Sequence, residues 1–174
     1  MTIEDDEDLA GMRRVGAVVA EARDAMLRSM CAGMSTADLD AIAREVLERH
    51  GARSAPMLAY GFPGWTCISV NDELAHGIPS RDRILRRGDL VNVDVSAELE
   101  GYWADTGASQ ALGEVGPRLR QLLEATRLAQ AEAMQQARAG RPLNGIARAV
   151  ERRAKRQGFR VVRNLGGHGV GRHI

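Results

Sequence analysis

Asp94 and Asp105 lie in two neighbouring stretches, 90–97 and 102–112, that the residue pattern predicts to be paired strands. Valines alternate with polar residues in the first stretch, so one strand face is apolar and the other carries Asp94. With the turn at 99–100, the two aspartates are direct cross-strand partners with Cβ atoms about 4.5–5.5 Å apart. Two carboxylates this close repel each other unless one is protonated or a cation lies between them. The pattern predicts either a site for two divalent ions or two exposed acids on a solvated sheet face.

Two histidines lie in segments that could bring them to such a site. His168 lies in the glycine-rich stretch 166–171, where the backbone can turn sharply, and imidazole is the commonest metal ligand. His76 lies between a predicted strand and a Gly-Ile-Pro turn, where it could act as an acid, a base or a hydrogen-bond donor. Either one could also be a loop histidine without a role. A set of oxygen and nitrogen donors without a thiolate favours Mn, Fe(II), Co or Zn over a structural zinc knot.

The elements that must position these side chains form a repeated pattern. Hydrophobic spacing predicts helices over 8–32, 36–50, 117–139 and 143–157, and strands over 66–70, 90–97, 102–112 and 159–165. A shift of 107 residues places Gly33 on Gly140 and Gly51 on Gly158, so both halves share a long helix, a shorter helix and a strand. Strands and loops follow at length only in the first half. The spacing therefore predicts two similar halves, the second incomplete.

Composition excludes several classes of protein. The chain has 174 residues, of which 44% are hydrophobic and 27% charged, with a net charge of +1; these values exclude a disordered chain, a collagen and a coiled-coil rod. The N-terminus shows no signal peptide, no apolar run is long enough for a membrane span, and Cys31 and Cys67 form no motif. We therefore expect a cytoplasmic protein with reduced thiols and no membrane partner.

Residues 117–163 hold 12 basic and 3 acidic residues, which indicates either a solvated helical face or a surface that docks on RNA such as the ribosome.

Four collinear motifs carry a resemblance to a known family. They are 68–79 (ISVNDELAHGIP), 88–95 (GDLVNVDV), 101–106 (GYWADT) and 167–172 (GHGVGR). In order and spacing they resemble type I methionine aminopeptidase, a metallopeptidase with the pita-bread fold. The resemblance implies an α+β protein of two pseudo-symmetric halves, with helices over a curved antiparallel sheet. It further implies that 1–174 is a single catalytic domain lacking its C-terminal part.

The resemblance also implies roles for individual residues. Asp94 corresponds to a chelating carboxylate, Asp105 to the carboxylate that bridges two divalent ions, and His168 to the imidazole ligand. His76 corresponds to the active-site histidine that contacts the substrate near the scissile bond. Phe62 and Cys67 correspond to part of the pocket for the methionine side chain, where an aromatic ring and a sulfur suit a thioether.

The activity implied is removal of the N-terminal methionine from nascent peptides through a metal-bridged hydroxide. The expected partners are such peptides and the ribosome, and the expected state is a monomer. The family carries two more glutamate ligands and another histidine beyond the position of Ile174, so we expect this chain to bind metal weakly and to cleave poorly. Two alternatives stay open: an inactive pita-bread binding module and a proline-specific aminopeptidase.

Overall fold

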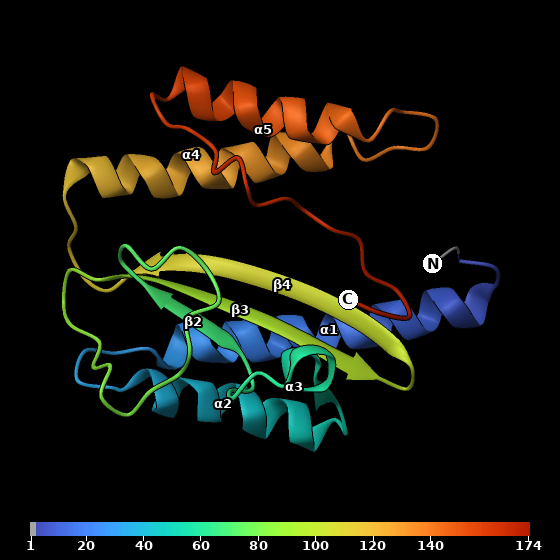
Figure 1. Ribbon diagram of the computed structural model, residues 1–174, viewed down its shortest axis with the longest axis horizontal. Helices are drawn as coiled ribbons and strands as arrows, with labels where there is room; N and C mark the ends of the chain where they lie inside the picture. The colour runs from blue at the N-terminus through green and yellow to red at the C-terminus, as the bar shows by residue number, and fades with distance from the viewer. Residues whose placement is uncertain (1–2) are drawn as a thin grey trace. The chain divides into compact units, whose positions relative to one another are not determined.

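The computed structural model describes residues 3–174, which form two compact units. The sheet unit comprises residues 3–114 and 168–174, and the helical unit comprises 115–167. Figure 1 labels the helices of both units and the longer strands of the sheet unit. Within residues 3–174, none of the helices combines the length and the apolar character that a membrane span requires.

The sheet unit begins with two capped helices. In α1 (Asp6–Ser29), the Asp5 side chain accepts a hydrogen bond from the Asp8 backbone N–H at 2.8 Å. In α2 (Thr36–Arg49), Ser35 and Asp38 form the reciprocal capping box expected for a serine followed three residues later by an acid. A one-and-a-half-turn helix, α3 (Ala55–Tyr60), follows. The two long helices confirm the predicted helical spacing, whereas α3 is too short for a periodic signal.

Four antiparallel strands form the sheet, with β3 (Leu90–Leu99) at its centre. One edge of β3 pairs first with β2 (Cys67–Val70) and then with β1 (Arg53–Ser54), and its other edge pairs with β4 (Tyr102–Ala111). The helices α1 and α2 cover one face of this sheet (Figure 1). The core between them is aliphatic: Val15, Val19, Ala22, Met26, Leu39 and Leu47 from the helices meet Ile68, Val70, Val91, Val93, Val95 and Ala97 from the strands.

The β3–β4 hairpin differs from its predicted register. Leu99 pairs with Tyr102, so the two turn residues are Glu100 and Gly101, with φ values of 52° and 82°. A two-residue turn of this kind needs positive φ at both positions, and glycine supplies the second without strain. The predicted turn at 99–100 is therefore wrong by one residue at each end. Asp105 lies opposite Ser96 rather than opposite Asp94.

The corrected register still leaves both aspartates on the same face. Moving the turn by one residue shifts the residue opposite Asp94 by two positions along β4. Residues two positions apart on a strand point to the same face of the sheet. Asp94 and Asp105 are thus diagonal neighbours on the face of the sheet opposite α1 and α2. Cys67 is the direct cross-strand partner of Asp94 on β2, so it shares this face.

The helical unit contains α4 (Pro117–Met134) and α5 (Asn144–Arg156), which pack through small residues such as Ala129 and Ala149. The glycines matched by the repeat all adopt left-handed backbone: φ is 93° at Gly33 and 78° at Gly140, 70° at Gly51 and 72° at Gly158. Gly51 and Gly158 directly follow the C-caps of α2 and α5, whereas Gly33 and Gly140 lie in the loops after α1 and α4. The shorter helix of each half thus ends in the same way. The strand predicted over 159–165 does not form, because no described strand pairs with it.

Candidate metal site

The Asp94 and Asp105 carboxyl groups lie near each other across the hairpin, close enough for the charge of Asp105 to raise the pKa of Asp94. Asp94 lies opposite Gly107, and its Oδ1 is 3.5 Å from the place a Cβ of Gly107 would occupy. The missing side chain leaves the β4 side of Asp94 open, so its carboxylate has room to lean toward Asp105. Two ionised carboxylates have only acceptors, so two carboxyl groups this close are stabilised either by a proton between them or by a cation.

The pair is electrostatically costly without a cation. Burial raises the pKa of Asp94 to about 7, and the charge and hydrogen bond of Asp105 add to the shift, while His168 opposes it. This is the behaviour of two like charges forced together in a partly dry site. A divalent ion between the oxygens would replace the proton and remove the repulsion.

His168 approaches Asp105 from the last segment of the sheet unit. Its Nε2 is 3.4 Å from Asp105 Oδ2, and its Nδ1 is 3.1 Å from the Gly169 carbonyl oxygen. Because a carbonyl can only accept, Nδ1 is the nitrogen that donates to Gly169, so Nε2 is the ring nitrogen that faces Asp105 and is placed to bind a metal. A histidine that ligates through one nitrogen and donates through the other is the common arrangement at metal sites.

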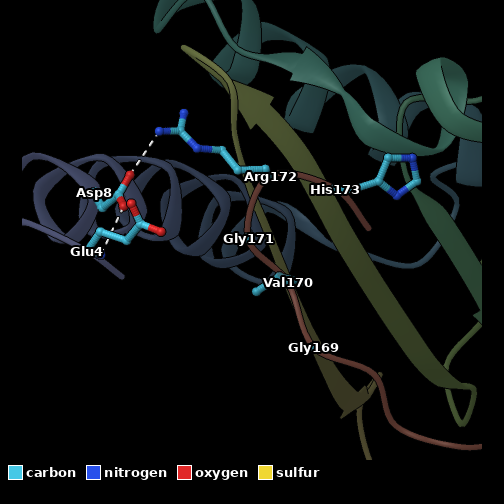
Figure 2. Close-up of a pocket in the computed structure, with 7 residues that line it drawn as sticks. All are labelled: Glu4, Asp8, Gly169, Val170, Gly171, Arg172 and His173. Carbon is cyan, nitrogen blue, oxygen red and sulfur yellow. Dashed lines mark hydrogen bonds and ion pairs between the residues drawn. The ribbon is translucent and has the colours of Figure 1, made fainter. Parts of the chain in front are cut away.

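The segment that carries His168 is irregular and is attached to the edge of β4. The Trp103 backbone N–H donates to the Gly171 carbonyl at 2.7 Å, and the Trp103 and His173 rings stack with centroids 5.3 Å apart. Figure 2 shows Arg172 and His173 pointing in opposite directions from this segment. His173 thus packs on the strand rather than joining the aspartates.

Cys67 lies next to the carboxylate pair as a buried thiol. Burial raises the pKa of this thiol to about 12, and the nearby charges of Asp94, Asp105 and Asp40 contribute. The thiol is therefore protonated at neutral pH, which agrees with a donor set of oxygen and nitrogen only. Phe62 is half-buried in the loop after α3, with its ring 3.3 Å from where a Gly64 Cβ would lie.

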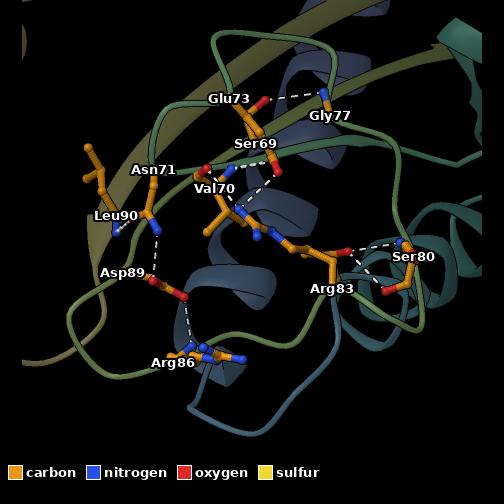
Figure 3. Close-up of polar contacts among 11 residues, drawn as sticks. Ser69, Val70, Asn71, Glu73, Gly77, Ser80, Arg83, Arg86, Asp89 and Leu90 are labelled. Atoms are coloured by element: carbon orange, nitrogen blue, oxygen red, sulfur yellow. Dashed lines mark hydrogen bonds and ion pairs between the residues drawn. The ribbon is translucent and has the colours of Figure 1, made fainter.

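The loop that carries His76 is folded back on β2 (Figure 3). The Ile68 N–H donates to the Gly77 carbonyl at 2.9 Å, the Gly77 N–H donates to Ser69 Oγ, and a Cβ on Gly77 would lie 2.1 Å from the Ile68 carbonyl oxygen. Only glycine permits this approach. It leaves His76 exposed and in the left-handed region, with φ of 54°, a strained conformation that surrounding contacts must hold.

Asp40 is a buried residue near the site that the sequence reasoning missed. Its carboxylate accepts hydrogen bonds from the Thr66 N–H at 2.8 Å, the Thr66 hydroxyl at 2.7 Å and the Trp65 N–H at 3.2 Å. Burial raises its pKa, and these donors oppose the rise. Asp40 thereby fixes the start of β2, immediately before Cys67. The only signal for it is an acid beside the apolar stripe of α2.

The donor types fit a divalent ion, although the three side chains are joined only in pairs. Among the described residues, no three His, Cys, Asp or Glu side chains gather closely enough to form a ready ion site. Asp105 is the shared neighbour, since Asp94 and His168 each lie beside it. Their facing acceptors, two carboxyl groups and a free imidazole nitrogen, are nevertheless a suitable donor set for a hard or borderline divalent cation.

Comparison with known proteins identifies relatives along the whole chain. The model of metallopeptidase family M24 matches residues 10–174. Methionine aminopeptidase 2 of Bacillus subtilis is 51% identical over 174 residues, which are all of this chain and 70% of that protein. A methionine aminopeptidase of Staphylococcus epidermidis is 43% identical and is covered to 69%. The resemblance inferred from the four motifs is confirmed.

Solved structures confirm the predicted fold class. Methionine aminopeptidase from Rickettsia prowazekii matches 99% of this chain with a TM-score of 0.93 at 32% identity, and 69% of that chain is covered. The enzyme from Thermotoga maritima matches with a TM-score of 0.95 at 28% identity, and 70% of it is covered. Prolidase from Pyrococcus furiosus shares the fold at 22% identity, with a TM-score of 0.85. This chain, which carries the paired aspartates and the glycine-flanked histidine, belongs to metallopeptidase family M24.

Proposed function

We propose that this chain takes part in removing the N-terminal methionine from nascent peptides. The observation that carries the proposal is the half-buried Asp94–Asp105 pair with His168 Nε2 3.4 Å from Asp105 Oδ2, in a chain whose relatives at 51% and 43% identity are named methionine aminopeptidases. Neither alternative is favoured. The carboxylate pair argues against a binding module without metal, and the proline-specific neighbours are only 18–22% identical.

Asp94, Asp105 and His168 would hold two divalent ions, which we expect to be Mn, Fe(II), Co or Zn. Bound there, the ions would lower the pKa of water and polarise the peptide carbonyl. Asp94 and Asp105 would give up their shared proton on loading, and the Nδ1–H bond to Gly169 would keep His168 Nε2 turned toward Asp105.

The remaining predicted residues would act on the substrate. His76 would donate a hydrogen bond to the oxygen of the scissile carbonyl as negative charge develops there, from a loop held rigidly by Gly77 against β2. Cys67, as a neutral thiol, and Phe62 would contact the methionine side chain, where a soft sulfur and an aromatic ring give favourable contacts with a thioether.

We further infer a cytoplasmic monomer, in keeping with the free thiols of Cys31 and Cys67. The many exposed arginines of 117–163 would suit a ribosomal RNA surface. Salt-dependent co-sedimentation with ribosomes, lost when the arginines of α5 are replaced by glutamine, would support this docking. Co-sedimentation that is insensitive to salt would contradict it.

Two measurements test the proposed function. The purified protein should bind Co²⁺ or Mn²⁺, and Asp94→Asn should weaken this binding by at least tenfold. With excess metal, the protein should release free methionine from Met-Ala-Ser slowly and leave Ala-Ser, and Asp94→Asn should abolish this low activity. Methionine release from the Asn variant at the parent rate would refute the proposal, and preferential cleavage of an X-Pro bond would favour the proline-specific alternative.

A further inference from the structure

A second polar cluster lies on the opposite face of β4 from the aspartate pair. Tyr102 Oη donates to Asp8 Oδ1 at 3.0 Å, and Arg172 Nη2 donates both to Asp8 Oδ1 at 2.8 Å and to Tyr102 Oη at 2.9 Å. The guanidinium of Arg172 also stacks over the Tyr102 ring, 3.8 Å from its centroid. Figure 2 shows Arg172 reaching toward Asp8 on α1. The three side chains form what we call the α1 clamp.

Asp8 is the buried anchor of this clamp. Its other oxygen, Oδ2, accepts from the Glu4 N–H at 3.1 Å, so both oxygens are engaged, and its side chain is only 12% exposed. The hydrogen bond from Glu4 lowers the pKa of Asp8, and those from Tyr102 and Arg172 lower it further. Asp8 is thus a fixed negative charge that demands a cationic partner.

Two glycines make room for the clamp. A Cβ on Gly11 would lie 2.2 Å from the Tyr102 ring, so the ring packs directly on the backbone of α1. A Cβ on Gly101 would lie 3.2 Å from Arg172 Nη1, so the hairpin turn leaves space for the guanidinium. An incidental surface ion pair needs neither adaptation, and most such pairs contribute little to stability.

The clamp holds a segment that has few other attachments. Residues 168–174 have no regular secondary structure, and within the described residues the bond from Trp103 N–H to the Gly171 carbonyl is the one backbone hydrogen bond between this segment and the strands. Arg172 contacts the α1 side of β4, whereas His173 stacks on Trp103 on the other side, where His168 meets Asp105. The segment therefore straddles the edge of the sheet.

We propose that Asp8, Tyr102 and Arg172 are positioning residues that set the place of His168 beside Asp105, so that the α1 clamp tunes metal binding from the far face of the sheet. Arg172 is four residues from His168 along an irregular segment that the Trp103 contacts and the clamp tie to β4. Release of Arg172 would free His168 to move away from Asp105. This inference rests on the proposed function, since it explains what holds His168 in place as a metal ligand.

The test compares Arg172→Gln with a matched control, Arg14→Gln. Arg14 lies on α1 and pairs with exposed Glu100 at 2.9 Å, so the control removes the same charge near the same turn. Visible absorption titration with Co²⁺ should show affinity reduced about 10–100-fold in Arg172→Gln, the range typical of residues that orient metal ligands, and unchanged in Arg14→Gln. Tyr102→Phe removes the two hydrogen bonds of the hydroxyl but keeps the stacked ring and the Arg172–Asp8 ion pair, so it should give a smaller loss.

A double-mutant cycle separates positioning from a general structural role. If Arg172 acts through His168, Arg172→Gln should cost nothing further in a His168→Ala background, whereas independent effects would add. Additive losses, or parental Co²⁺ affinity in Arg172→Gln, would overturn the proposal.

Hydrogen exchange gives a readout that does not depend on metal. In EDTA, the Trp103 N–H, which donates to the Gly171 carbonyl, should exchange faster in Arg172→Gln than in Arg14→Gln, and equal rates would also overturn the proposal. If the parent binds no Co²⁺, the proposed function fails, and the exchange comparison alone decides whether the clamp positions the segment.

Discussion

Replacing Asp94 by asparagine should stabilise the metal-free protein while it destroys the metal site. In the absence of metal, burial and Asp105 raise the pKa of Asp94 to about 7, so the folded chain holds a proton that the unfolded chain releases near pH 4. Because the pKa is raised in the folded state, proton binding by Asp94 stabilises the fold fully below about pH 4. This stabilisation is lost as the pH rises to 7. Above pH 7 the folded state must carry the charged, repelling pair.

The size of this effect follows from the shift. Three pKa units correspond to about 4 kcal/mol of unfolding free energy between pH 4 and pH 8. In Asp94→Asn, the amide can donate to the Asp105 carboxylate at every pH, so the variant should avoid most of this loss. At pH 8 we expect the variant to exceed the parent by up to about 4 kcal/mol, or roughly 10 °C in melting temperature for a chain of this size.

Urea unfolding in EDTA at pH 5 and pH 8, followed by tryptophan fluorescence, measures the difference. Both tryptophans, Trp65 and Trp103, lie in the sheet unit, so the signal reports the unit that carries the site. Asp82→Asn, at an exposed position, is the control and should change stability by less than about 0.5 kcal/mol. A variant less stable than the parent at pH 8, or one with the parent's full pH dependence, would refute the account of a strained carboxylate pair.

Three further outcomes follow from the same structure. Binding of Mn²⁺ below pH 7 should release a proton, so the apparent Kd for Mn²⁺ should rise by up to about tenfold for each unit by which the pH is lowered. Calorimetry in two buffers of different ionisation enthalpy measures the proton release. Gly11→Ala should destabilise the chain by about 1–3 kcal/mol because its Cβ would overlap the Tyr102 ring. A Cβ at Gly16, on the same helix, meets no atom within 4 Å, so Gly16→Ala should stabilise the chain by up to about 1 kcal/mol. Equal effects of the two substitutions in urea unfolding would contradict this packing. Iodoacetamide at pH 7.5 should label exposed Cys31 long before buried Cys67, and mass spectrometry of the digested protein would expose the reverse order.

The sequence predicts the helices well because their signals are local. Ser35 and Asp38 mark the start of α2, and Gly51 and Gly158 end α2 and α5 through a left-handed backbone that other residues rarely adopt. The strand over 159–165 fails for the opposite reason. A strand is stable only when a neighbour satisfies its backbone groups, and an apolar run says nothing about whether such a neighbour is present.

The hairpin shows how a small local error leaves the functional conclusion intact. Alternation in β3 places Asp94 on the correct face, and any turn shift that changes the pairing by two keeps Asp105 there. What alternation cannot supply is the exact pairing, which depends on the positive φ of Glu100 and Gly101. The aspartates are consequently diagonal, and Gly107 rather than Asp105 lies opposite Asp94.

Asp8 and Arg172 are 164 residues apart in the sequence, and neither has a local pattern that points to the other. Their contact arises because β4 offers its two faces to different partners: Tyr102 faces α1, and Trp103 and Asp105 face the site. A segment that pairs with the edge of such a strand presents alternate side chains to both faces, as Arg172 and His173 do. The glycine-flanked motif around His168 therefore carries two functions in a few residues, a candidate ligand for one face and its anchor on the other, and only the ligand is visible from residue type alone.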